Sequence, residues 1–289
     1  MNPAKLVAVI MLVSLTFGAG LEINREHFAA MVKNASLLAR ALVANFILVP
    51  IYGALLAAAL LSHDSGVATG FLLMAIAPGV PFVMLGARKK GGRLALAVTM
   101  ALFFPLISVL TVPITASLVL PPDYRASLPI GQFVTTLVLF QFVPVILGVL
   151  LAARLPEAAG KIAKPVRILF LLAIVALLVL LGPRMVRDVS EVYGSNGMWA
   201  MLCIVVLSMV TGWLLGGPGE PERRTLSIGT ALRNIGLCAL VATTSFGATS
   251  RVASAVIAYL LVQIIVTTIV GVFFARSAKA KSAAQEIAV

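Results

Sequence analysis

Residues 225–249 constrain the fold most, because this stretch is long and apolar enough to cross a membrane yet carries Arg233 and Asn234 near its middle. At 1.5 Å per residue, Arg233 lies roughly 12 Å from the start of the stretch, near the middle of a hydrocarbon core about 30 Å thick. A lone arginine there costs about 2.5–3.5 kcal/mol on insertion scales. Gly229 and Gly236 flank it and allow the helix to unwind around the polar groups. A membrane helix that breaks at its midpoint in this way is typical of the binding site of a secondary transporter.

The whole chain has the composition of a polytopic membrane protein. Of its 289 residues, 61% are hydrophobic and only 11% are charged, whereas the surface of a soluble domain needs far more charge. The net charge of +12 does not indicate nucleic-acid binding, because the basic residues lie between apolar segments, where they set topology. We therefore expect an all-α protein in a lipid bilayer, with one membrane domain over residues 1–275 and a polar, disordered tail over residues 276–289.

Nine apolar segments are expected to span the bilayer, and the two halves of the domain are about 1–120 and 127–275. The first segment could also be a signal peptide, but the membrane pattern that follows it favours a first span. The nine expected spans are residues 4–21, 37–61, 66–86, 94–119, 127–153, 166–183, 197–216, 225–247 and 252–275.

The basic residues predict the orientation of these spans. With the N-terminus outside, sixteen Lys and Arg residues fall in segments that face inside and five in segments that face outside; Arg233, within a span, completes the total of 22. Cytoplasmic loops carry such an excess of positive charge. We therefore expect a plasma (bacterial inner) membrane protein with its N-terminus outside and its C-terminus in the cytoplasm.

An internal repeat relates the two halves. The run RLALAV from Arg93 matches RVASAV from Arg251, and at the same offset Pro78 falls opposite Gly236. The third expected span contains Ala-Pro-Gly-Val-Pro at residues 77–81, and two prolines so close together break a helix. Pro78 lies roughly 18 Å into that span. The pattern predicts two inverted repeats, with two broken helices that cross near the membrane midplane.

The acidic residues identify what Arg233 lacks. All ten lie in loops, tails or span edges, so no span interior offers a carboxylate to pair with this arginine. Buried charges are normally paired. The simplest missing partner is a small organic anion, since a guanidinium binds carboxylate, sulfonate or phosphate through two parallel hydrogen bonds. The structural alternative is that backbone carbonyls freed at the third-span break hold Arg233.

We expect the substrate site at the two breaks, with no metal site and no cofactor. The breaks themselves contribute backbone and side-chain groups, while nearby spans add two amides and a hydroxyl, although amides inside a membrane more often join helices than bind ligands. The candidate substrate-binding residues are Arg233, Asn234, Asn45, Gln263, Pro78, Gly79 and Thr230.

The chain resembles the bile acid:sodium symporter family over nearly its whole length. The resemblance rests on the runs FGAGLEI, ANFILVP, APGVP with the following LALAVTM, and RTLSIGTALRNIGL. It implies two inverted repeats with a crossing pair of broken helices. The usual bacterial form of that family has ten spans, and this chain is similar to a form that begins at the second.

The chain departs from the family at the positions that the resemblance assigns to sodium. Val83 and Met84 stand where Ser and Asn usually supply ligands, and the next helix has alanines in place of hydroxyls. At the second break, Gly229 and Arg233 stand where the family usually has Glu and Gln. Asn234 and Asn45 keep amides, and Gln263 replaces a frequent His. The resemblance therefore implies a fixed cation where a sodium ion would lie.

These observations predict a secondary transporter of a small organic anion that works by alternating access without ordinary sodium coupling. Two alternatives stay open: a sodium-coupled symporter of organic anions or bile acids, and a membrane sensor that binds an anion without moving it. An enzyme is not expected, because the spans contain no metal-ligand cluster, Ser/His/Asp set or paired carboxylates.

Overall fold

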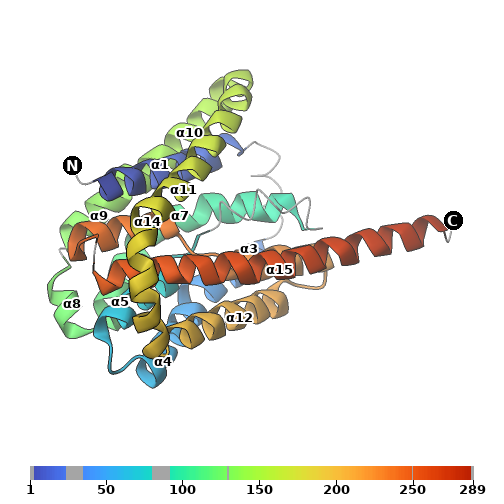
Figure 1. Cartoon of the computed structure of the whole chain (residues 1–289). Helices are drawn as coiled ribbons and strands as arrows, with labels where there is room; N and C mark the ends of the chain where they lie inside the picture. The colour runs from blue at the N-terminus through green and yellow to red at the C-terminus, as the bar shows by residue number, and fades with distance from the viewer. Residues whose placement is uncertain (1–2, 24–34, 80–91, 129, 249, 288–289) are drawn as a thin grey trace.

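The protein is helical. The computed structural model describes residues 3–23, 35–79, 92–128, 130–248 and 250–287, and its one β-type pairing among these residues is an isolated antiparallel bridge between Pro78 and Arg233 (Figure 1). The expected all-α class is confirmed.

Helical elements account for most of the described residues. They are α1 (Pro3–Leu21), α3 (Ala35–Val43), the π-helical segment η1 (Ala44–Leu48), α4 (Val49–Leu60), α5 (Ser65–Ile76), α7 (Leu94–Val119), α8 (Pro122–Ala126), α9 (Ile130–Leu137), the π-helical segment η2 (Val138–Phe142), α10 (Val143–Arg154), α11 (Pro156–Gly194), α12 (Gly197–Leu215), α13 (Glu220–Ala231), α14 (Ile235–Val241), the π-helical segment η3 (Ala242–Phe246) and α15 (Arg251–Ile287).

Seven helices in the described part are each long and apolar enough to cross a membrane: α1, α3 through α4, α7, α9 through α10, α11, α12 and α15. The other two expected spans are those with predicted breaks. Their described apolar helices, α5 and α14 through η3, are shorter. The protein is therefore an integral membrane protein, and its second short apolar element is interrupted between α13 and α14.

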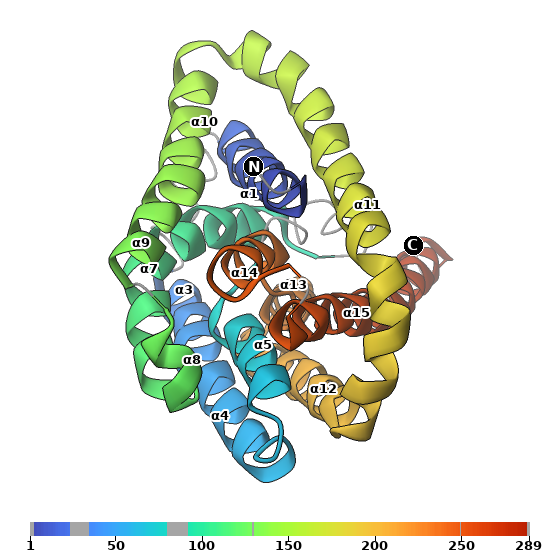
Figure 2. The ribbon, with the colours of Figure 1, turned by 60° about the vertical axis from the view of Figure 1, so that its left-hand side comes forward.

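The helices form two groups that meet at α14. Figure 2 shows α1 enclosed by α10 and α11 at one end of the molecule and α4, α5 and α12 toward the other, with α13, α14 and part of α15 between them. Glycines bring α1 and α10 into backbone contact: a Cβ on Gly20 would lie 2.4 Å from the carbonyl oxygen of Val145, and one on Gly148 would lie 2.4 Å from that of Phe17. Small residues allow this close approach of helices in a membrane.

Two π-helical segments precede prolines. The sequence Val-Pro opens α4 after η1 and α10 after η2. Pro50 and Pro144 cannot donate a backbone hydrogen bond to the preceding turn, and the turn widens there. Asn45 lies within η1 and Gln141 within η2, so both amides belong to widened turns.

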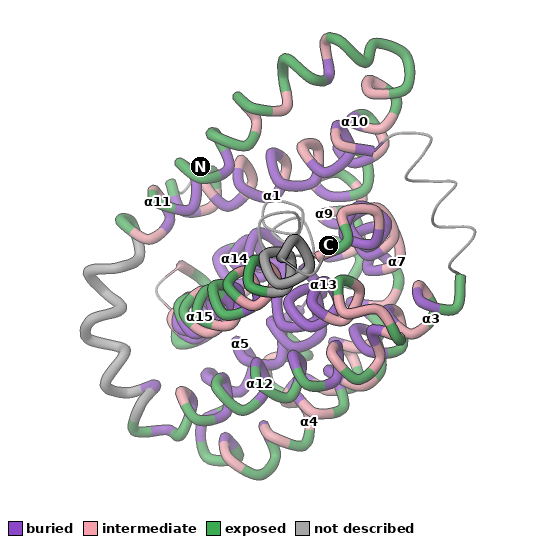
Figure 3. The backbone as a smooth tube through the Cα atoms, turned by 90° about the vertical axis from the view of Figure 1, so that its right-hand side faces the viewer, coloured by how far each residue is buried: buried purple, intermediate pink, exposed green. Residues whose placement is uncertain are grey.

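The burial pattern is that of a membrane protein. Figure 3 shows buried residues concentrated on α5, α13 and α14, while the outer helices expose long stretches. The exposed side chains there are largely aliphatic or aromatic, which suits contact with lipid. Examples more than 60% exposed are Leu55, Leu110, Leu118, Val179, Leu214 and Phe273.

The expectation of a disordered tail is wrong in the described part. Helix α15 begins at Arg251 and continues to Ile287 without interruption (Figure 1). The run from residue 276 is rich in Ala and also contains Lys, Arg, Gln and Glu, which favour helix, and it contains no Gly or Pro to end one.

Candidate functional site

The site lies where two helices end and the chains that follow them pair with each other. Helix α5 ends at Ile76 and α13 ends at Ala231, and the chain that follows each is extended. The two extended pieces run antiparallel: Gly79 N donates to the Leu232 carbonyl at 3.1 Å, and Asn234 N donates to the Ala77 carbonyl at 2.9 Å. Because a bilayer core offers no water to unpaired backbone groups, this mutual pairing is what allows both helices to break there.

Gly79 is required at the crossing for steric reasons. A Cβ built on Gly79 would lie 2.2 Å from the carbonyl carbon of Arg233 and 2.3 Å from the backbone nitrogen of Asn234. Real Cβ atoms do not approach backbone atoms so closely. The glycine therefore lets one strand of the crossing lie directly against the other.

Arg233 is the largest fully buried side chain in the described part of the protein. Its Nη1 donates to the Ala75 carbonyl at 3.4 Å and its Nη2 donates to the Thr230 carbonyl. Its backbone N–H donates to Gln263 Oε1 at 2.9 Å. Backbone carbonyls near both breaks thus hold the guanidinium, which is the structural alternative that the sequence left open.

The electrostatics of this arrangement come from helix ends. Ala75 and Thr230 lie in the last turns of α5 and α13, where the carbonyl ends of the helices carry partial negative charge. Two such ends converge on one guanidinium. The described ion pairs join other residues, and none of them includes Arg233. The site therefore holds one full positive charge. It is offset by the partial negative charges of two helix ends and not by a carboxylate.

Several polar atoms at the crossing have no hydrogen-bond partner among the described residues. They are Arg233 Nε, Gln263 Nε2, Asn45 Oδ1 and Tyr259 Oη, all of them buried. Tyr259 interacts electrostatically with Arg233, and Gln263 follows Tyr259 by one helical turn on α15. Apart from the tyrosine, which interacts with the guanidinium, two of these atoms carry hydrogens to donate, Arg233 Nε and Gln263 Nε2, so the unfilled capacity of the described site favours a partner with acceptor oxygens.

Asn45 connects α3–α4 to the second broken helix. Its Nδ2 donates to the Ala41 carbonyl at 3.0 Å and to Thr230 Oγ1 at 3.3 Å. Because Thr230 also offers its carbonyl to Arg233, the hydroxyl and carbonyl of one residue contact two candidate residues. Asn45 therefore contacts the same turn of α13 as the guanidinium.

Asn234 directly follows Arg233 in the chain and precedes the first residue of α14. Its Oδ1 accepts from Leu237 N at 3.1 Å, which makes it the N-cap of that helix. Its Nδ2 donates to Gln141 Oε1 at 2.8 Å. In this structure, both polar ends of the Asn234 side chain therefore have protein partners.

The structure brings all seven candidate residues together. Four lie in the breaks, and the other three are hydrogen-bonded to them or to one another. Of the positions that the resemblance assigns to sodium ligands, Ala97, Ala101 and Gly229 are buried and offer no side-chain oxygen, whereas Val83 and Met84 lie outside the described residues.

Sequence reasoning missed two residues of the site, Gln141 and Tyr259. The spacing of Tyr259 and Gln263 on one face of α15 could have indicated the tyrosine. For Gln141 no local signal exists, because its partner is set by how α9 and η2 pack against α14.

Comparisons with known proteins agree with the resemblance found in the sequence. The model of the Sodium Bile acid symporter family matches residues 9–188. A relative in Oryza sativa subsp. japonica, described as a probable sodium/metabolite cotransporter BASS3 of the chloroplast, is 25% identical over 248 residues. That alignment covers 82% of this chain and 56% of the relative, so the chain matches little more than half of that protein's length.

Proposed function

Because the chain belongs to the sodium bile acid symporter family, we propose that it carries a small organic anion across the membrane by alternating access, without ordinary sodium coupling. Membership of this family supports a membrane transporter and not an enzyme. The substrate and the coupling are our proposal.

One observation carries the proposal: a fully buried guanidinium lies at the crossing of the broken helices, between carbonyls of α5 and α13. In secondary transporters, unwound carbonyls and half-helix carboxyl ends are where a coupling cation binds. Here the Arg233 side chain takes that place permanently. A second cation in contact with it would be repelled, so we expect no sodium ion to be needed there.

The same residue supports an organic anion as the substrate. Among the described residues, Arg233 Nε and the amide nitrogen of Gln263 have no hydrogen-bond acceptor, and Gln263 is bonded to the backbone of Arg233 through its Oε1. A carboxylate or sulfonate supplies both the missing negative charge and the acceptors for these donors. We propose that the substrate site comprises Arg233, Asn234, Asn45, Gln263, Thr230 and the backbone at Pro78 and Gly79.

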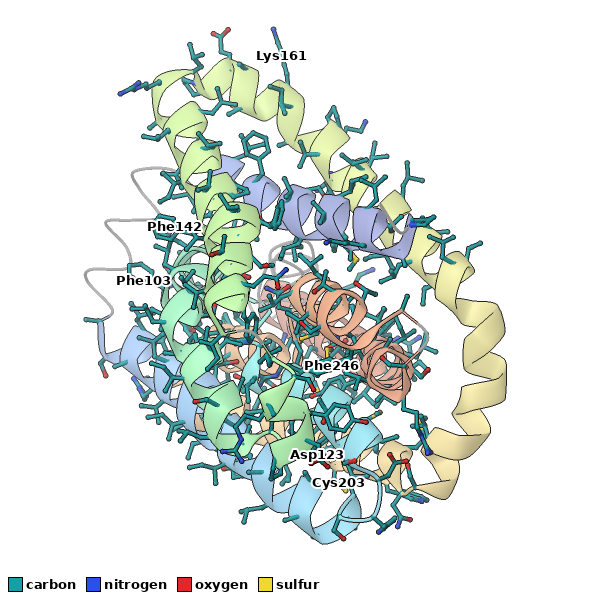
Figure 4. The ribbon with its side chains drawn as sticks, turned by 90° about the vertical axis from the view of Figure 1, so that its left-hand side faces the viewer. Phe103, Asp123, Phe142, Lys161, Cys203 and Phe246 are labelled. Atoms are coloured by element: carbon teal, nitrogen blue, oxygen red, sulfur yellow. The ribbon has the colours of Figure 1, made fainter. Side chains whose placement is uncertain are left out.

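We also propose that residues 1–120 and 127–275 are inverted repeats in a plasma (bacterial inner) membrane, with the N-terminus outside and residues 276–289 in the cytoplasm. The antiparallel pairing of the two breaks supports this arrangement, since a two-fold axis in the membrane plane would pass through such a crossing. Figure 4 shows Lys161 at one end of the molecule in this view and Asp123 with Cys203 at the other.

Sodium coupling is the second candidate, because the relative from rice is named as a sodium/metabolite cotransporter. Backbone carbonyls and threonine hydroxyls would then have to supply the ligands. The two candidates differ in one measurable property, which is whether an external sodium gradient drives accumulation.

The experiment uses the purified protein in proteoliposomes. A thermal-shift panel of small carboxylates and sulfonates first identifies a ligand, since binding to the folded state raises its stability. Counterflow of that labelled anion then separates a carrier from a sensor, because a sensor binds without exchange across the membrane. Uptake with sodium or choline outside should be similar. A large stimulation by sodium would overturn the uncoupled mechanism, and binding without counterflow would overturn transport.

A further inference from the structure

Gln141 is the buried residue of η2. Its side chain is fully buried, and it is the only residue of that five-residue π-helical segment in the buried class. The neighbours Leu139 and Phe142 are exposed on the outer face. A polar side chain that points into the interior of a membrane bundle needs hydrogen-bond partners there, and π-helical turns often occur at functional sites.

The hydrogen bonds of Gln141 fix the direction of both amides. Its Nε2 donates to the Pro105 carbonyl at 2.9 Å and to Ser108 Oγ, so its Oε1 must face Asn234. The Asn234 amide is fixed from the other side, because its Oδ1 accepts from the Leu237 N–H, which can only donate. Neither amide can flip without losing a partner, so Asn234 Nδ2 donates to Gln141 Oε1 and not the reverse.

This hydrogen bond joins the two groups of helices. Gln141 belongs to the continuous element α9–η2–α10, whose last part is in backbone contact with α1 at Gly20 and Gly148. Asn234 belongs to the crossing and starts α14. Close by, α14 lies against α1, since a Cβ on Gly236 would be 3.0 Å from Leu12 Cα. A transporter that exposes its site alternately to two sides must move one group against the other.

We propose that Gln141 is a positioning residue of the transport cycle: it orients Asn234 at the crossing and holds the α1–α14 interface closed in the conformation seen here. The proposal rests on the proposed transport function for its role, because only a carrier needs this interface to open. When the interface opens, the Asn234 amide loses its partner in α9–α10. The hydrogen bond between Asn234 and Gln141 therefore favours the closed α1–α14 interface when no substrate is bound.

The test measures opening of the interface directly and needs no substrate. Leu12→Cys places a thiol on α1 against Gly236, in a chain where the exposed Cys203 is replaced by Ser. The probe is N-ethylmaleimide, applied to proteoliposomes, with labelling of each cysteine followed by mass spectrometry. We expect slow labelling of Cys at position 12 in the parent and labelling several-fold faster when Gln141→Leu is added.

Two internal controls separate this role from general loosening. Gln132→Leu changes an exposed glutamine on α9 of the same element and should leave labelling unchanged. The native Cys238 lies on α14, is buried and is hydrogen-bonded to the Leu73 carbonyl of α5. It should remain protected in the Gln141→Leu variant, because the packing of α14 against α5 stays intact.

Ser108→Ala provides a milder variant that weakens the hold on Gln141 without touching Asn234, and it should give an intermediate rate. If Gln141→Leu does not fold, as judged by its elution in size-exclusion chromatography, this variant decides.

Labelling rates equal to those of the parent in every variant that folds would overturn the proposal. Equal acceleration at position 12 and Cys238 would also overturn it, as a loss of packing. Failure of anion transport in the separate counterflow assay would leave these labelling rates unaffected, so the two proposals fail distinguishably.

Discussion

Arg251 stands 158 positions after Arg93, and the two arginines make equivalent ion pairs. Arg93 precedes α7 and pairs with Glu222 in the first turn of α13; Arg251 starts α15 and pairs with Asp64, the N-cap of α5, at 2.7 Å. The carboxylates are themselves 158 positions apart. Each arginine thus pairs with the acid of the other half of the chain, and the two pairs join each broken helix to the helix that follows the other break.

The first prediction concerns these pairs. Because Arg93 and Arg251 are 46% and 50% exposed, solvent screens each pair, and each should stabilise the fold by only about 0.2–1 kcal/mol. Arg93→Glu should lower the apparent Tm in detergent slightly, and adding Glu222→Arg should restore part of the loss. A charge swap that gives no recovery would show that the pair does not stabilise the protein.

The second prediction concerns Gly79. A methyl group at this position would meet the backbone of Arg233, so Gly79→Ala should separate the two breaks and cost about 1–3 kcal/mol, the usual range for overpacking. Thermal unfolding in detergent measures this. Gly160→Ala is the matched control, because a Cβ there meets nothing within 4 Å and alanine favours a helix. Equal stability of the two variants would contradict the close crossing.

The third prediction concerns Arg233. Arg233→Gln should fold and should weaken binding of the screened anion by about 2–5 kcal/mol, the range for truncating one partner of a buried charge pair. Arg233→Lys should restore binding only in part, because an ammonium lacks the planar fork of the guanidinium. Titration calorimetry gives the affinities, with the exposed Arg154→Gln as control. Unfolding of Arg233→Gln, with normal binding by any protein that survives, would make the arginine structural.

The fourth prediction concerns topology. In a chain without Cys203, a cysteine in place of Lys161 should react with a membrane-impermeant reagent only from the cytoplasmic side, and a cysteine in place of Asp123 only from outside. The excess of basic residues in the segments assigned to the cytoplasm is the reason. Labelling of position 161 in intact cells would reverse the orientation.

The sequence predicts the crossing well because its causes are local. Pro78 lies just past the end of α5, and an arginine between glycines lies just past the end of α13, so both helix ends could be placed within a few residues. The candidate residues of the site follow from the same reasoning, since few residues within the apolar spans have polar side chains.

Other features depend on packing that a single sequence does not specify. Gln141 is significant only because η2 turns it toward Asn234, and whether Arg233 faces carbonyls or a ligand depends on where α5 and α13 end. The helix through residue 287 differs from the expected disordered tail because its residues, although polar, favour helix.

A resident guanidinium at the crossing also has an electrical consequence. If the crossing moves relative to the membrane, the empty carrier moves a positive charge, while the carrier loaded with a monovalent anion moves none. Each elementary charge that crosses the full membrane potential is worth about 2.3 kcal/mol per 100 mV. A negative interior therefore acts on the return of the empty site and draws it toward the cytoplasm. Voltage would then set how long the protein waits for its next substrate on each side.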